Sequence, residues 1–175
     1  MTNAQWHMLT LIGEDKPGIV AAITRALFEL GLNLGETSML RLGGNFTVMM
    51  MVSGAVDEAS LAERLGPVIE AQGMRLHVDP IQGRLHHHLV PNIQVTVTGA
   101  DRAGIVAQVT GALAEVGFNI LDLESDVAGT AQKPVYIMQI AGVAEVPVEA
   151  VESALEALRR EGVDVNVSAI ETYIG

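Results

Sequence analysis

The sequence contains no cysteine and has few aromatic and few basic residues. The lack of cysteine excludes disulfides, thiolate metal sites, cysteine nucleophiles and iron–sulfur clusters. Aromatic residues make up only 3% of the chain, so platforms on which nucleic-acid bases could stack are scarce. Ten Lys and Arg residues stand against 21 Asp and Glu, and the net charge of −11 argues against binding to phosphate backbones. We therefore expect no direct contact with nucleic acid.

The chain also lacks a long apolar run and a recognisable targeting segment. No stretch of about 18 apolar residues is present, so we expect no membrane-spanning helix and no membrane partner. The N-terminal segment carries no basic stretch ahead of an apolar one and no small-residue cleavage site. These features predict a soluble, acidic, cytoplasmic protein. Its 175 residues suffice for one ordinary domain or two small ones.

An internal repeat organises the chain. Residues 7–36 match residues 93–122 at a constant offset of 86, and 13 of the 30 pairs are identical. The match resumes near the end of each copy at an offset of 89, where Ile81 meets Ile170. We therefore expect a first domain at 1–82, a linker at 83–92 and a second domain at 93–175.

Each copy is predicted to contain four strands and two helices in the order βαββαβ. Residues 93–99 alternate apolar and polar side chains, which is typical of a half-buried strand. Asp57 is expected to cap the second helix of the first copy, and a kink is expected at Pro67. The equivalent helix of the second copy is predicted as one helix over 147–161. This order folds compactly as an antiparallel four-stranded sheet with both helices on one face, so we predict an α+β protein of two ferredoxin-like domains.

The third strand of the first copy, residues 46–53, is apolar on both of its faces. An antiparallel sheet with helices on one side normally presents a polar face on the other. We expect the additional apolar face to be covered by the second copy or by another chain. The less favoured alternative is an apolar ligand-binding surface formed by the methionines.

The turn between the first strand and the first helix is the most informative motif, GEDKPGIV in the first copy and GADRAGIV in the second. Its glycine, Gly18 or Gly104, allows a close approach to the backbone. Free N–H groups and the helix dipole at such a turn favour an anion such as a carboxylate. A purely structural explanation stays open, since Asp15 and Asp101 could cap the helices and the glycines could serve tight helix–strand packing.

Asn33 and Asn119 each follow the turn glycine by 15 residues, at the point where the chain re-enters the sheet. We expect both to lie beside the first turn of their copy. An asparagine there could donate to a carboxylate and accept from an ammonium group, which suits a zwitterion. The alternative is an ordinary turn-forming asparagine after glycine.

The sequence gives little sign of metal binding or catalysis. His86 to His88 are consecutive, and neighbouring side chains of an extended segment point to opposite sides, so we expect a solvated linker and no metal site. No P-loop, GxSxG, HExxH or dinucleotide-binding fingerprint is present. We expect a protein that is not an enzyme and needs no cofactor.

The segments DKPGIVAAITRALFELGLNL and DRAGIVAQVTGALAEVGFNI resemble the start of the ACT domain, a small amino-acid-sensing regulatory module. Two such copies in tandem resemble the glycine cleavage system transcriptional repressor family. The resemblance implies that ACT domains pair side by side and bind a small amino acid at the seam between them. Carried over by position, it implies ligand contacts from six residues: Asp15, Gly18, Asn33, Asp101, Gly104 and Asn119.

Some positions depart from the family pattern. Members that bind amino acids often carry Asn where Asp15 and Asp101 stand, and Ala103 replaces Pro17 in the second copy. The identity of the ligand therefore stays open. The resemblance implies a homo-oligomeric regulator that binds glycine or a similar amino acid and modulates transcription through a protein partner, such as a DNA-bound regulator. The alternative is an ACT-fold scaffold or regulatory subunit that acts by protein association alone, without a ligand.

Overall fold

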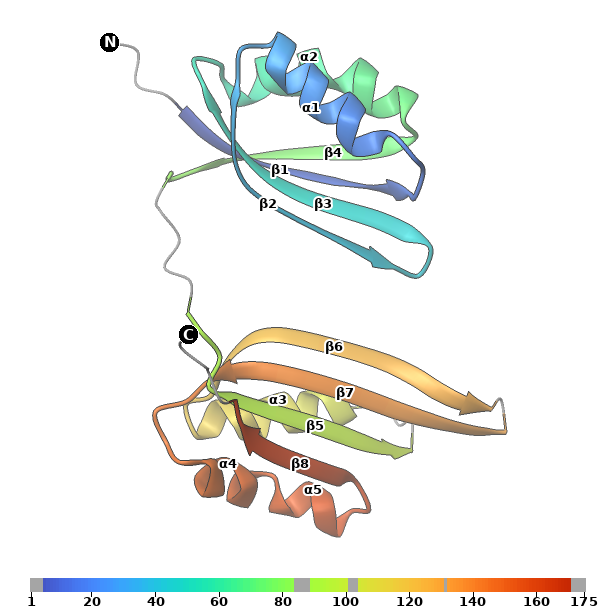
Figure 1. The fold of residues 1–175 in the computed structure, drawn as a ribbon, viewed down its shortest axis with the longest axis vertical. Helices are drawn as coiled ribbons and strands as arrows, with labels where there is room; N and C mark the ends of the chain where they lie inside the picture. The colour runs from blue at the N-terminus through green and yellow to red at the C-terminus, as the bar shows by residue number, and fades with distance from the viewer. Residues whose placement is uncertain (1–4, 84–88, 101–103, 131, 171–175) are drawn as a thin grey trace. The chain divides into compact units, whose positions relative to one another are not determined.

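The computed structural model describes residues 5–83, 89–100, 104–130 and 132–170. The chain divides into two compact units, Met1–His86 and His87–Gly175, which we call the first and the second unit (Figure 1). Each unit is one four-stranded antiparallel sheet with its helices on a single face. The predicted α+β class with two ferredoxin-like domains is therefore confirmed.

The first unit follows the order βαββαβ, and its sheet has the strand order β2-β3-β1-β4. Its elements are β1 (Gln5–Glu14), α1 (Ile19–Glu29), β2 (Asn33–Leu42), β3 (Asn45–Gly54), α2 (Glu58–Ala71) and β4 (Met74–Ile81). Asp57 is the N-cap of α2, and its carboxylate accepts a hydrogen bond from the backbone N–H of Ser60 at 2.8 Å. The predicted cap is confirmed, and α2 continues through Pro67.

The second unit repeats this plan with the strand order β6-β7-β5-β8. Its elements are β5 (Ile93–Ala100), α3 (Ile105–Glu115), β6 (Asn119–Thr130), β7 (Lys133–Val143), α4 (Val148–Ala154), α5 (Glu156–Arg160) and β8 (Asp164–Ala169). The prediction of one helix over 147–161 is wrong, because the helix breaks at Leu155. Leu155 is fully buried, and tight hydrogen bonds on either side of it, Leu155 N–H to Glu152 and Leu158 N–H to Leu155, turn the chain onto the core.

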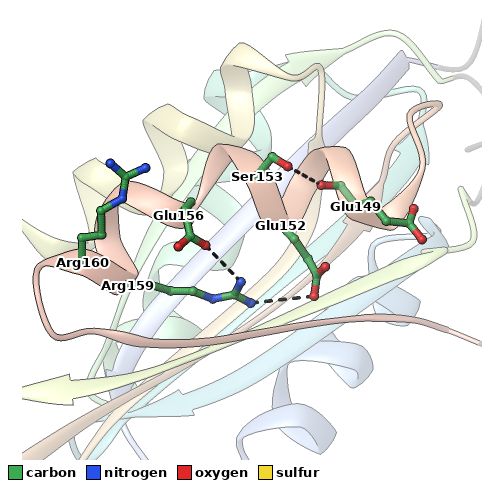
Figure 2. Close-up of a pocket in the computed structure, with 6 residues that line it drawn as sticks. All are labelled: Glu149, Glu152, Ser153, Glu156, Arg159 and Arg160. Atoms are coloured by element: carbon green, nitrogen blue, oxygen red, sulfur yellow. Dashed lines mark hydrogen bonds and ion pairs between the residues drawn. The ribbon is translucent and has the colours of Figure 1, made fainter.

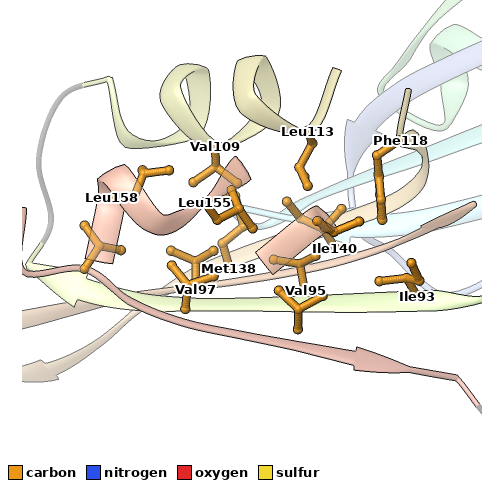
Figure 3. Close-up of a cluster of buried hydrophobic side chains, with 14 of the residues drawn as sticks. Ile93, Val95, Val97, Val109, Leu113, Phe118, Met138, Ile140, Leu155 and Leu158 are labelled. Carbon is orange, nitrogen blue, oxygen red and sulfur yellow. The ribbon is translucent and has the colours of Figure 1, made fainter. Parts of the chain in front are cut away.

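Each unit has its own core between the sheet and the helices. In the second unit Ile93, Val95 and Val97 are buried together, which confirms the alternation predicted for residues 93–99 (Figure 3). The same alternation in β1 buries Leu9 and Leu11 of the first unit. The core faces are thus set by the period of two along the central strands.

The open faces of the two sheets differ in character. In the first unit the strand register places Met8, Ile12 and Met49 on the face away from the helices, and Met49 is 45% exposed. In the second unit the equivalent face carries Gln94 and Thr96 from β5. The apolar open face predicted for the first unit is therefore present, while its covering by another surface stays a prediction. Among the described residues, no helix has the length and apolar character needed to span a membrane.

Candidate functional site

The loop between β1 and α1, residues 15–18, forms what we call the first corner. The equivalent loop between β5 and α3, residues 101–104, forms the second corner. Of the second corner the structure describes Gly104 alone. Asp101 lies outside the described residues, so its role stays a prediction.

The glycine of each corner is required by the backbone. Gly18 and Gly104 are the N-caps of α1 and α3 and hold the left-handed conformation, with φ of 92° and 88°. A Cβ atom built on either glycine would meet no heavy atom within 4 Å. The glycines therefore serve the turn and not a tight helix–strand contact, and the space in front of them is open.

Asp15 does not cap α1, because the N-cap is Gly18 and no side chain caps this end of the helix. The capping explanation is therefore wrong for the first corner. The Asp15 carboxylate instead accepts a hydrogen bond from Nε of Arg41 on β2, with 2.5 Å between the two atoms. The Arg41 guanidinium also lies over the Phe46 ring, 5.8 Å from its centroid.

Arg41 was not among the residues predicted from the sequence. The signal that could have found it is the strand register: Gly13, Phe46 and Arg41 form one row across β1, β3 and β2. That row lies next to the end of β1, where the first corner begins. Because β2 and β3 form a hairpin, the pairing of Arg41 with Phe46 follows from the position of the turn at Gly43 and Gly44.

A hollow of about 520 Å³ lies over the first corner. This volume is within the range of about 300–1,000 Å³ that small-molecule sites occupy. Met39, Phe46 and Val20 contribute apolar lining, while Asp15 contributes a negative charge and Arg41 and Lys16 contribute positive charges. Lys16 is paired with Glu14 at 3.3 Å. The hollow thus combines apolar walls with side chains of both charges.

The end of α1 adds hydrogen-bond donors to this hollow. The first N–H group bonded at this end of α1 is that of Ala22, which donates to the Gly18 carbonyl oxygen at 2.9 Å. The N–H groups of residues 19–21 precede it and have no partner within the helix. Together with the helix dipole and Arg41 they favour an anion, whereas Asp15 favours a cation. A molecule that carries both charges matches this set.

Asn33 and Asn119 start β2 and β6, at the end of the sheet opposite the corners. Asn33 pairs with Ser53, which in turn pairs with Trp6 near the start of β1. The expected position beside the corner is therefore wrong. The physical reason is that β2 runs in the same direction as β1, so its end and not its start approaches the corner. The proposed contact of both asparagines with a ligand is a separate question and stays a prediction.

The two corners differ in what their edge strands contribute. In the row where the first unit pairs Arg41 with Phe46, the second unit pairs Val127 with Tyr136. Val127 is 52% exposed and carries no charge. Arg41 thus has an apolar counterpart in the second unit, so we expect the corners to differ in their affinity for an anion.

The described residues contain no group of three or more His, Asp or Glu side chains placed to hold a metal ion. His86 to His88 lie outside these residues. His77 is exposed and forms a 3.1 Å pair with Asp79. His7 is buried, and its Nδ1 has no hydrogen-bond partner among the groups that the structure describes.

Another hollow, of about 530 Å³, lies on α4 and α5 of the second unit, and Figure 2 shows the residues that line it. Arg159 pairs there with Glu152 and Glu156 at 3.7 and 3.4 Å, and its Nη2 donates to the Val165 carbonyl oxygen at 2.8 Å. These internal partners occupy the guanidinium. We therefore assign no function to this hollow.

Comparison with known proteins relates both units to one family. The profile of the ACT domain family matches residues 7–79 and 92–168. The glycine cleavage system transcriptional repressor of Escherichia coli K12 is 25% identical over 166 residues, which cover 92% of this chain and 87% of that protein. The UPF0237 protein YjhC of Lactococcus lactis is 39% identical over 72 residues, or 41% of this chain and 83% of that protein.

Solved structures share the fold of the chain. A protein of unknown function from Galdieria sulphuraria is 25% identical, with a TM-score of 0.71 over 97% of this chain and 100% of that one. A putative glycine cleavage system transcriptional repressor is 20% identical, with a TM-score of 0.67 over 97% and 99%. The resemblance stated from the turn motifs is thus confirmed by sequence, and the tandem fold by structure.

Proposed function

The chain belongs to the ACT domain family, and from that premise we propose that it is a non-enzymatic regulatory protein that binds a small amino acid at its first corner. Similarity to a transcriptional repressor over 92% of the chain supports a regulatory, ligand-binding protein. The observation that carries the proposal is the Asp15–Arg41 pair beside the open space in front of Gly18. It places a carboxylate and a guanidinium at the N-terminus of a helix, while Lys16 of the same hollow is paired with Glu14.

A zwitterion would use both charges. Its carboxylate would bind Arg41 and the free N–H groups of α1, and its ammonium group would bind Asp15. The Asp15 and Arg41 side chains are 36% and 70% exposed, and an exposed ion pair contributes only about 0–1 kcal/mol. Opening this pair for a ligand therefore costs little, and the ligand replaces one internal contact with two.

The size of the ligand limits its affinity. A very small ligand gains at most about 1.5 kcal/mol per heavy atom. Glycine has about five such atoms, so its dissociation constant would be about 10 μM at best. Such an affinity suits a sensor of an abundant metabolite.

Asn33 could join the site from a second copy of the chain. β2 is an edge strand, and all ten of its residues are exposed. Two copies that pair antiparallel along β2 would bring the start of one β2 beside the end of the other. This pairing would place Asn33 of one copy near the first corner of its neighbour, which supports a homo-oligomer.

Regulation of transcription would proceed through a protein partner. The net charge of −11 disfavours direct contact with DNA, so the chain would act on a DNA-bound regulator. A gel-shift assay with the purified protein at moderate salt should show no complex with DNA. Tight binding in that assay would contradict the need for a protein partner and would indicate direct contact with DNA.

Calorimetric titration tests the ligand. Glycine, serine and leucine are the candidates, and N-acetylglycine and glycinamide are matched controls that lack the ammonium group or the carboxylate. We expect at least one of the amino acids to bind and both controls to bind much more weakly. If none of the three amino acids gives a heat of binding or a shift of the melting temperature, the proposal that the protein senses an amino acid is refuted.

The apolar open face of the first unit favours a second candidate, a scaffold that acts by association alone. Light scattering with and without the amino acids separates the two. The assembly of a scaffold would be unaffected by the ligand, whereas a sensor that pairs along β2 beside its site should change its assembly or its stability on binding.

A further inference from the structure

We propose that the first unit carries a second small-molecule site, for a compact organic cation, at the end of β1 opposite the first corner. A hollow of about 390 Å³ lies there, and we call it the histidine pocket. It is lined by residues 5–7 of β1, by Glu58 of α2, and by residues 80, 81 and 83. At about 3.3 Å per residue along β1, this pocket and the first corner lie roughly 25 Å apart.

His7 is the feature that the fold leaves unexplained. It lines the pocket, it is only 3% exposed, and its Nδ1 has no hydrogen-bond partner among the described groups. Buried polar groups in native proteins are nearly always hydrogen-bonded, because leaving one unpaired is destabilising. A ligand that supplies the missing partner would remove this penalty.

The second unit shows what the fold itself requires at this position. At the repeat offset of 86, Ile93 stands where His7 stands, and it too is 3% exposed. An aliphatic side chain therefore satisfies the packing of this strand. Histidine in the first unit is not needed for the fold, which points to a chemical use.

The other polar groups of the pocket are also particular to the first unit. Asn92 replaces Trp6 at the same offset, and its amide closes that end of the second sheet by hydrogen bonds of 2.8 and 3.1 Å with the backbone of Ala144. α4 begins after Pro147 with Val148, where α2 begins with Glu58. The duplication has thus kept the fold at this end and changed the chemistry of one copy.

The lining selects the class of ligand. Glu58 contributes a carboxylate, and no Lys or Arg is found among the described residues that line the pocket. Trp6 also lines the pocket, although its side chain leaves β1 on the face opposite to His7, and an indole is the aromatic ring that binds cations best. Since no group of three metal-ligating side chains exists among the described residues, an organic ammonium ion fits this set better than a metal ion. The ammonium group would face Glu58, and the apolar body of the ligand would extend around the end of β1 toward Trp6.

The chain provides its own reporter, because Trp6 is its one tryptophan. Benzylamine, which is protonated at pH 7.5, is the probe, and benzyl alcohol is the neutral control of the same shape. In titrations of the full-length protein, we expect a saturable change of Trp6 emission with benzylamine and a far weaker one with benzyl alcohol. No saturable change up to about 10 mM benzylamine, or an equal response to the alcohol, would overturn the proposal.

Three variants locate the effect. Glu58→Gln should weaken benzylamine about fivefold or more, because it removes the charge beside the ammonium group. His7→Ile copies the second unit and should weaken binding while the protein stays folded by circular dichroism. Arg41→Ala, at the far end of β1, should bind benzylamine as the parent does. Unchanged affinity in Glu58→Gln contradicts the proposal even if His7→Ile fails to fold.

Discussion

Asp15 and Arg41, 26 residues apart in the sequence, form an ion pair of 2.5 Å that links the first corner to the edge strand β2. The pair passes above β3, where the Arg41 guanidinium lies over the Phe46 ring. Two charges of opposite sign thus meet at the mouth of a hollow whose remaining walls are largely apolar. Both charges remain partly exposed, so a ligand can compete for them.

Arg41→Ala should abolish amino-acid binding at the first corner and leave the fold intact. The variant removes the one guanidinium of the hollow, whereas its ion pair is exposed and contributes less than about 1 kcal/mol to stability. Arg41→Lys should restore binding in part, since a lysine keeps the charge but not the planar fork. Calorimetry gives the affinity, and urea unfolding gives the stability.

The control for that experiment is Arg75→Ala. Arg75 is exposed on β4 and pairs with Ile12, so it lies on the opposite face of the same sheet. Arg75→Ala changes the net charge by the same amount as Arg41→Ala and should leave amino-acid binding unchanged. Equal losses in both variants would mean that the net charge, and not the position of Arg41, governs the affinity.

Local signals in the sequence predicted most of the elements. The alternation at residues 93–99 identified β5, and Asp57 caps α2 as predicted. Each of these features depends on residues a few positions apart. Periodicity and capping residues therefore sufficed to identify them.

The features that the sequence did not predict depend on contacts between segments that are distant in the chain. Asn33 was placed at the wrong end of the sheet because its position depends on the direction of β2 relative to β1. The break at Leu155 follows from packing onto the core and not from a helix-breaking residue. Arg41 was missed because its partner Asp15 is brought to it only by the complete sheet.

Gly18→Ala should weaken both stability and ligand binding. The positive φ of 92° costs a residue with a Cβ about 1–2 kcal/mol, and the new methyl group would project into the open space of the first corner. Gly31→Ala is the matched control, with a φ of 69° at the other end of α1. It should lose similar stability and keep its affinity. If both variants bind the amino acid as the parent does, the open space before Gly18 is not the site.

Gly13 and Gly99 occupy equivalent positions of the repeat, yet their substitution by alanine should affect the stability of the protein differently. A Cβ on Gly13 would lie 2.8 Å from the Gly73 carbonyl oxygen, which cannot move without shifting the backbone. On Gly99 the nearest atom would be 3.7 Å away, an ordinary contact. Gly13→Ala should therefore cost about 1–3 kcal/mol, and Gly99→Ala should be nearly neutral. The midpoints of urea unfolding measure the stability of the two variants. Equal midpoints would show that the backbone of β4 shifts at Gly73 without a cost in stability.

Acid should remove the stability that the Asp57 carboxylate gives to α2. A hydrogen bond from the Ser60 backbone N–H lowers the pKa of the Asp57 carboxyl below its usual 3.8. The carboxylate therefore stabilises the fold above pH 3.8, and this contribution is lost as the pH falls through the lowered pKa. Asp57→Ser keeps a cap that does not titrate, so its melting temperature should approach and then match that of the parent as the pH falls below 3.8. At pH 7, Asp57→Ala should melt a few degrees below Asp57→Ser. A gap between parent and Asp57→Ser that stays constant from pH 7 to pH 2.5 would mean that the Asp57 charge does not stabilise α2.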